Sequence, residues 1–102
     1  MSRKLPTIQP DSTWLIQNMA SLGHIVRNQR AKLALRIDDA AALCGVSADL
    51  LSRCENGKPI TTNKLLLILQ GMGLHLMTLP AQHAVRLAPA LQALTQELDP
   101  TP

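Results

Sequence analysis

Residues 35–57 read LRIDDAAALCGVSADLLSRCENG, and this stretch decides how the chain folds. Asp38 and Asp39 lie where the positive end of a helix dipole favours acidic side chains, and the apolar run after them stops at Gly45. Ser47 is a suitable N-cap for a second short helix, which the final Asn-Gly pair of the stretch then ends. The stretch therefore predicts two short helices joined by a tight glycine turn.

Two short helices that cross steeply at a glycine turn form a helix-turn-helix, whose second helix projects as a rod that fits the major groove of DNA. Ala41 is small enough to lie at the crossing, while Val46 and Leu51 are placed to hold the second helix against the first. The outward positions are left for bases and phosphates: Ser47, Ala48, Asp49, Ser52 and Arg53.

A first helix is predicted upstream of this unit. Its apolar residues recur at helical spacing as far as Leu33, and either Asp11 or Ser12 is a plausible N-cap. A break is the alternative, because Ser21 could itself cap a shorter helix. Two prolines and little apolar periodicity predict a flexible arm over residues 1–10.

Two further helices are expected downstream. The fourth is capped by Thr61 or Thr62, runs to about Gln70 and ends at a pair of glycines. A short C-terminal helix has Pro89 in its first turn, so residues 81–102 are predicted to be a tail that contains a short helix.

The run 74–79, bounded by a glycine and a proline, is too short for a helix and suits a strand. A single strand in a helical chain lacks a partner for its backbone, so that partner is expected in another copy of the chain or in another protein. A twofold dimer through the strand would set two recognition helices about one helical turn apart, which implies a palindromic operator. The predicted dimerisation residues are Leu74, His75, Leu76, Met77, Thr78 and Leu79.

The composition favours an all-α chain. Trp14 is the only aromatic residue although 46% of the residues are hydrophobic, so the core is built from aliphatic side chains that suit packed helices. A chain of 102 residues is one domain with a modest core, which we place at residues 11–80. The whole net charge of +3 lies between residues 22 and 64, which permits a nucleic-acid partner.

No enzyme or metal site is indicated. Cys44 and Cys54 lack metal-ligand spacing and are expected to be small buried hydrophobic residues in a protein of the reducing cytoplasm. The three histidines have no carboxylate or cysteine at ligand spacing, so neither a cofactor nor catalysis is predicted. Glu55 is expected to bond the backbone or a neighbouring arginine.

Several short motifs lie in fixed register between residues 22 and 58: Leu22-Gly23, Val26-Arg27, Arg30, Gly45-Val46-Ser47, Leu51-Ser52-Arg53 and Glu55-Asn56-Gly57-Lys58. They resemble, in order, the first helix, the turn and the end of the recognition helix of the Xre/Cro family of helix-turn-helix repressors. The resemblance implies a lambda-repressor-like domain of four to five helices. The fourth helix and the run 73–79 resemble HipB-type antitoxins, in which a C-terminal strand pairs across a dimer and a HipA-type kinase toxin is the partner.

The chain departs from the family at the start of the second helix, where Arg36-Ile37 replaces the usual Thr-Gln, and at Ala40, where leucine is typical. Arg36 would supply a phosphate contact in place of the glutamine. Asp49 either accepts from cytosine N4 or repels phosphate, and Arg53 contacts guanine or phosphate. Further DNA contacts are predicted at Arg27, Lys58, Thr62 and Lys64, although Arg27, Arg30 and Lys32 are equally well explained as a solvated or structural face.

Three functions remain open on the sequence. The first is an autoregulating antitoxin that represses its own operon on double-stranded DNA and holds a HipA-type kinase inactive, since residues 81–102 exceed what a DNA-binding unit requires. The second is a stand-alone Xre-type repressor without a toxin. The third is an interaction module that has lost strong DNA binding and uses 74–79 to assemble a complex.

Overall fold

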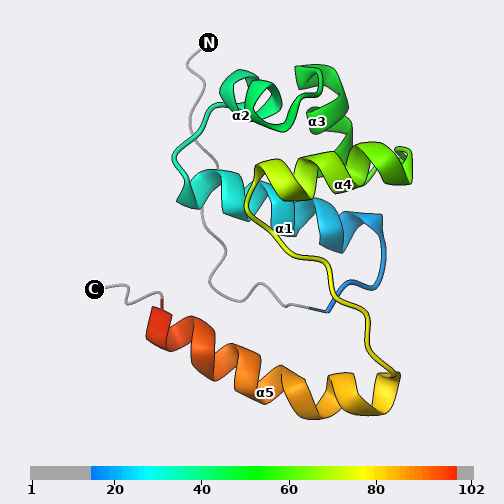
Figure 1. Cartoon of the computed structure of the whole chain (residues 1–102), viewed down its shortest axis with the longest axis vertical. Helices are drawn as coiled ribbons and strands as arrows, with labels where there is room; N and C mark the ends of the chain where they lie inside the picture. Colours follow the sequence, from blue (N-terminus) through cyan, green and yellow to red (C-terminus); the bar gives the residue numbers. More distant parts are fainter. Residues whose placement is uncertain (1–14, 99–102) are drawn as a thin grey trace.

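A computed structural model describes residues 15–98, which form five α-helices (Figure 1). The predicted arm over residues 1–10, the candidate caps Asp11 and Ser12, and Trp14 lie outside the described residues. The structure contains no strand within residues 15–98, and none of the helices there is long and apolar enough to cross a membrane. The all-helical prediction is therefore confirmed for this part of the chain.

Helix α1 (Met19–Lys32) begins later than expected, because residues 15–18 are not helical. Asn18 is the N-cap: its Oδ1 accepts from the backbone N–H of Ser21 at 2.9 Å, and Ser21 Oγ accepts from the backbone N–H of Asn18 at 3.2 Å. This reciprocal capping box satisfies two donors at the helix start. The prediction that the helix runs continuously from Asp11 or Ser12 is wrong, and Ser21 is the third helical residue rather than the cap.

The two helices of the central unit form where the sequence predicts them. Helix α2 (Ile37–Cys44) ends at Gly45, whose φ of +75° is a left-handed conformation that glycine adopts without strain. Helix α3 (Ala48–Glu55) begins at Ser47, whose Oγ accepts from the backbone N–H of Leu50 at 3.1 Å. Of the Asn-Gly pair that ends α3, Gly57 is left-handed at a φ of +75°, whereas Asn56 keeps a negative φ of −93°.

Helix α4 (Thr62–Gly71) is capped by Thr61, whose Oγ1 accepts from the backbone N–H of Lys64 at 3.3 Å. Gly71 lies in its last turn rather than beyond its end, and Met72 is the C-cap.

The core lies between α1, α2, α3 and α4, with α1 packed on α3 and α2 packed on both α3 and α4. Ala41 and Leu51 are buried as predicted, and Val46 packs partly against the same cluster. Ala40 is completely buried, so the small side chain in place of the family's leucine lies in the core itself. The buried apolar residues are Leu22, Val26, Ala40, Ala41, Cys44, Leu51, Cys54, Ile68, Leu69 and Met72.

Helix α5 (Ala81–Leu98) lies apart from the other four helices, to which residues 73–80 connect it (Figure 1). The carbonyl of Pro80 accepts from the backbone N–H groups of His83 and Ala84 at 2.9 and 3.1 Å, which starts the helix there. Pro89 is therefore in the middle of an 18-residue helix, and its expected place in the first turn of a short helix is wrong.

The run 74–79 adopts no regular secondary structure in the single chain. Leu74 is tied to the end of α4, since its backbone N–H donates to the carbonyl of Leu69 at 2.8 Å. Beyond it the side chains are largely exposed, with Leu76 at 48% and Met77 at 69%. Because strand pairing requires a second backbone, the expectation that this run pairs across a dimer stays a prediction.

Candidate nucleic-acid interface

The residues predicted to face DNA fall into two groups in the structure. Ser52 and Arg27 are half-buried, and Ala48 packs partly against the core rather than projecting freely. The remaining predicted residues are exposed: Ser47, Asp49, Arg53, Arg36, Lys58, Thr62 and Lys64.

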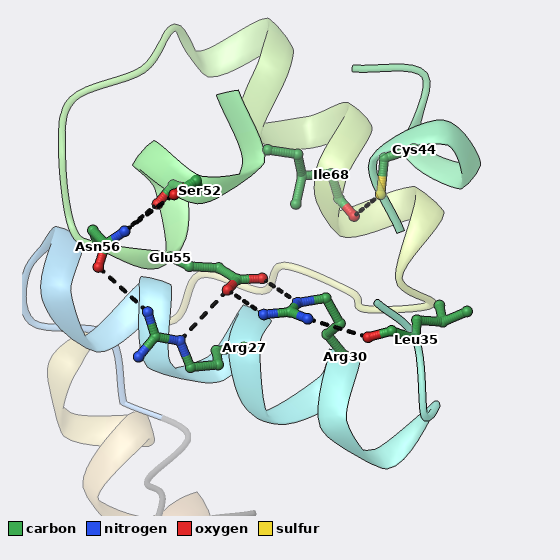
Figure 2. A network of polar contacts seen from close by, with 8 residues as sticks. All are labelled: Arg27, Arg30, Leu35, Cys44, Ser52, Glu55, Asn56 and Ile68. Carbon is green, nitrogen blue, oxygen red and sulfur yellow. Dashed lines mark hydrogen bonds and ion pairs between the residues drawn. The ribbon is translucent and has the colours of Figure 1, made fainter. Parts of the chain in front are cut away.

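A buried ion pair between Arg30 of α1 and Glu55 of α3 holds the inner side of α3 against α1 (Figure 2). Arg30 Nε donates to Glu55 Oε2 at 2.7 Å, and Arg30 Nη2 donates to Glu55 Oε1 at 2.8 Å. Arg30 Nη1 also donates to the carbonyl of Leu35 at 3.1 Å. This two-pronged geometry is the strong form of an arginine–carboxylate contact, and it joins α1, the loop before α2 and α3 into one unit.

The ion pair resolves two sequence-based questions. Glu55 has a side chain only 2% exposed and bonds a neighbouring arginine, so its structural role is confirmed. For Arg30 the sequence left a solvated face and a structural role open, and burial decides for the structural role. The charge of Glu55 could have indicated the pair from the sequence. A carboxylate buried at the end of α3 requires a cationic partner.

Arg27 extends the same network toward the surface. Its Nε lies 3.5 Å from Glu55 Oε1, and its Nη2 donates to Asn56 Oδ1 at 3.3 Å (Figure 2). Asn56 Nδ2 in turn donates to the carbonyl and the Oγ of Ser52, at 2.8 and 3.3 Å. The Arg27 side chain remains 39% exposed. This linking role of Asn56 was not predicted from the sequence, although Asn56 follows Ser52 by four residues, the spacing at which side chains meet on a helix.

Arg53 bends toward the loop that follows α3. Its Nη2 donates to the carbonyl of Pro59 at 3.2 Å, and the backbone N–H of Lys58 donates to the carbonyl of Arg53 at 2.9 Å. Arg53 and Lys58 thus belong to one compact basic turn at the end of α3. A turn of this kind can neutralise phosphate beside the groove that α3 would enter.

The starts of α2 and α4 offer further phosphate-binding groups. Arg36 is the N-cap of α2, makes no side-chain capping bond and is exposed. The backbone N–H groups of a helix's first turn are themselves donors for a phosphate. Ile37, which replaces the family's glutamine, packs partly against the core. At α4, Thr62 and Lys64 are exposed beside the capped helix start.

Both cysteines are buried, as the sequence predicts. Cys44 Sγ donates weakly to the carbonyl of Ile68 at 3.5 Å (Figure 2), and burial raises the pKa of this thiol. Burial and the neighbouring Glu55 raise the pKa of the Cys54 thiol to about 11. No group of three or more potential metal-ligating side chains occurs among the residues that the structure describes.

These pKa shifts predict slow thiol chemistry in the folded protein. At pH 8 the raised pKa leaves Cys54 with a thiolate fraction about 100-fold below that of a free cysteine, and only the thiolate attacks iodoacetamide. We expect Cys54 alkylation to be slower by at least that factor in buffer and ordinary in denaturant, measured by mass spectrometry. Equal rates in both conditions would contradict the buried placement.

The arrangement of α2, the glycine turn and α3, with an outward basic turn, defines a DNA-binding regulator of the helix-turn-helix class. Residues 21–76, more than half of the chain, match the family model described as helix-turn-helix domain. The chain therefore belongs to this Xre-like family of helix-turn-helix domains. The sequence matches no curated protein. The match ends before α5, which lies wholly outside the shared domain.

Proposed function

We propose that this protein is a transcriptional repressor that binds a palindromic operator with α3 in the major groove and acts by binding, without catalysis. The observation that carries the proposal is that α3 is clamped to α1 through the buried Arg30–Glu55 pair while Asp49 and Arg53 stay exposed on it. A helix held rigidly by its inner face and open on its outer face is what groove binding requires.

In this proposal phosphate contacts supply most of the affinity, and base reading is narrow. Two of the predicted base-reading hydroxyls already have partners in the chain, because Ser47 caps α3 and Ser52 accepts from Asn56. Two charged side chains remain that could distinguish one base from another. Asp49 would accept a hydrogen bond from cytosine N4, and Arg53 would donate to guanine. The basic turn, Arg36 and the start of α4 would hold the backbone on either side.

Substituting the basic turn tests the proposed interface. We expect Arg53→Ala to weaken binding to the DNA upstream of the protein's own gene by about 10-fold. Lys58→Ala should reduce the slope of log affinity against log salt by about one unit if it holds a phosphate. Fluorescence anisotropy across a salt series measures both effects.

Arg86→Ala is the matched control, since it removes the same charge from exposed α5, outside the shared domain. The interface is elsewhere if Arg53→Ala and Arg86→Ala bind equally well. Binding without any sequence preference would overturn the repressor proposal itself.

We propose further that residues 74–79 pair with the same run of a second copy and thereby form the homodimer. The support is that the run has no regular secondary structure and carries exposed apolar side chains, and that beyond Leu74 its backbone makes no hydrogen bond to another backbone group of the described residues. Leu76→Pro removes a ladder donor and is expected to yield monomers in analytical ultracentrifugation. Leu76→Val keeps the donor and favours a strand, so it should leave the dimer intact; a Leu76→Pro dimer would place the interface elsewhere.

The narrower form of the proposal is an antitoxin that regulates its own operon in complex with a HipA-type kinase. It is supported by the resemblance of residues 73–79 to HipB-type antitoxins and by α5, which exceeds the shared domain. A reading frame for such a kinase beside the gene, and a stable complex of the two purified proteins, are the expected results. If no kinase gene lies beside this one, a stand-alone Xre-type repressor is the better description. If the protein does not bind DNA, it is better described as an interaction module.

A further inference from the structure

We propose that Pro59 is a positioning residue for the reading of DNA. Its backbone carbonyl holds the guanidinium of Arg53 away from Asp49, which leaves both charged groups available to the bases. The inference rests on the proposed DNA binding by α3, and it adds how the two charges on the outer side of this helix are kept from neutralising each other.

Asp49 and Arg53 are placed to form an ion pair with each other. They lie four residues apart on the exposed side of α3 with the acid nearer the N-terminus, which is the favourable order for a pair on a helix. Within residues 15–98, however, no ion pair joins them, and Arg53 Nη2 instead donates to the carbonyl of Pro59 at 3.2 Å. The carbonyl thus takes the place of Asp49 as the partner of Arg53.

The loop that carries this carbonyl is fixed on both sides of Pro59. Gly57 lies so close to α1 that a Cβ at this position would be 3.0 Å from Ala20 Cα. Ile60 packs partly against the core, and the Oγ1 of Thr61 caps α4. The proline ring itself holds φ near about −65°. The Pro59 carbonyl is therefore an acceptor whose position is set by the fold and not by the exposed surface alone.

Both charged side chains keep bonding groups for DNA in this arrangement. A guanidinium has five N–H donors, so one bond to Pro59 leaves enough for the two that guanine O6 and N7 accept. Asp49 is exposed, and its carboxylate is not engaged by Arg53. In the major groove, guanine presents these acceptors and its paired cytosine presents an amino donor, so the two side chains match the two bases of a G·C pair. An ion pair between Asp49 and Arg53 would occupy the same groups.

Nuclear magnetic resonance of the full chain without DNA tests the bond to Pro59. Nitrogen relaxation of Arg53 Nε reports how freely the guanidinium moves, and Arg36 is the matched reference, because it is exposed and makes no side-chain capping bond. We expect Arg53 Nε to be more ordered than Arg36 Nε. Pro59→Gly keeps the carbonyl but removes the ring that fixes its position, so it should reduce that difference. Equal order of the two arginines in the unsubstituted chain would overturn the proposal.

Affinity for the DNA upstream of the protein's own gene tests the consequence for reading. Fixing a long side chain in advance lowers the entropic cost of binding, so Pro59→Gly should weaken binding by about 3-fold. It should have no effect in an Arg53→Ala chain, where nothing is left to position. Arg36→Ala is the matched background, since it removes an arginine to which Pro59 is not bonded, and there the 3-fold loss from Pro59→Gly should remain.

The two backgrounds separate a positioning role from a structural one. Equal weakening by Pro59→Gly in the Arg53→Ala and Arg36→Ala chains, with sequence preference intact in the unsubstituted chain, would overturn the positioning role alone. An unsubstituted chain that binds DNA without sequence preference would overturn the proposed function, and the reading of bases with it.

Discussion

Replacing Glu55 with glutamine is expected to lower the free energy of unfolding by about 3–5 kcal/mol, the largest effect of any single substitution considered for this chain. The carboxylate accepts two bonds from Arg30, whose side chain is only 10% exposed. A glutamine of the same shape keeps one acceptor but turns an N–H₂ donor toward the guanidinium. Arg30 is then left as a buried charge with an incomplete set of partners. Urea denaturation followed by circular dichroism measures the loss.

Asp49→Asn is the control for this substitution. It neutralises a carboxylate on the same helix, but Asp49 is exposed in the first turn, where its interaction with the helix dipole contributes less than about 1 kcal/mol. The double variant Arg30→Met, Glu55→Met removes both charges and should lose less stability than the two single variants together. Equal losses for Glu55→Gln and Asp49→Asn would mean that the pair contributes nothing to the fold.

Gly71→Ala is expected to destabilise the fold by about 3 kcal/mol, the upper part of the range for an overpacked core. A Cβ at this position would lie 2.5 Å from Cys44 Sγ and 2.6 Å from Cys44 Cα. The second of these is a backbone atom, so α2 and α4 would have to move apart. The gain of about 1 kcal/mol in helix propensity from glycine to alanine opposes this loss but is smaller.

Gly45→Ala separates steric conflict from backbone strain. No atom lies within 4 Å of a Cβ built at Gly45, but its φ of +75° is unfavourable for alanine, so a loss of about 1–2 kcal/mol is expected from strain alone.

Adding Cys44→Ala to Gly71→Ala removes the sulfur but leaves the backbone Cα of residue 44 in place. The double variant should therefore regain only part of the stability lost in Gly71→Ala. Complete recovery would show that the thiol, rather than the helix approach, is what Gly71 accommodates.

The sequence predicted α2, α3 and α4 well because their boundaries are set by local chemistry. Ser47 and Thr61 cap their helices through bonds that span three residues, and Gly45 ends α2 by its own conformational freedom. The start of α1, in contrast, lies later than the sequence predicts, at Met19. Apolar spacing before Met19 continued the helical pattern, whereas Asn18 with Ser21 formed the cap that starts the helix.

The sequence predicted where the candidate site lies, but not which of its side chains already bond to other groups of the chain. The helical period identified Ser47, Asp49 and Arg53 as outward positions, whereas Ala48 packs partly against the core and Ser52 is half-buried. It could not show that Ser52 is already bonded to Asn56, or that Arg53 bends to the carbonyl of Pro59. These contacts depend on how the chain returns after α3, and they change which side chains remain available to bases.

By itself, the sequence determined that a helix-turn-helix lies between residues 35 and 57, because caps, a left-handed glycine and helical periodicity act over a few residues. Tertiary structure decided that Arg30 is buried as the partner of Glu55, 25 residues away. The pair depends on which distant groups share the core, and the spacing of residues along a chain carries no record of that.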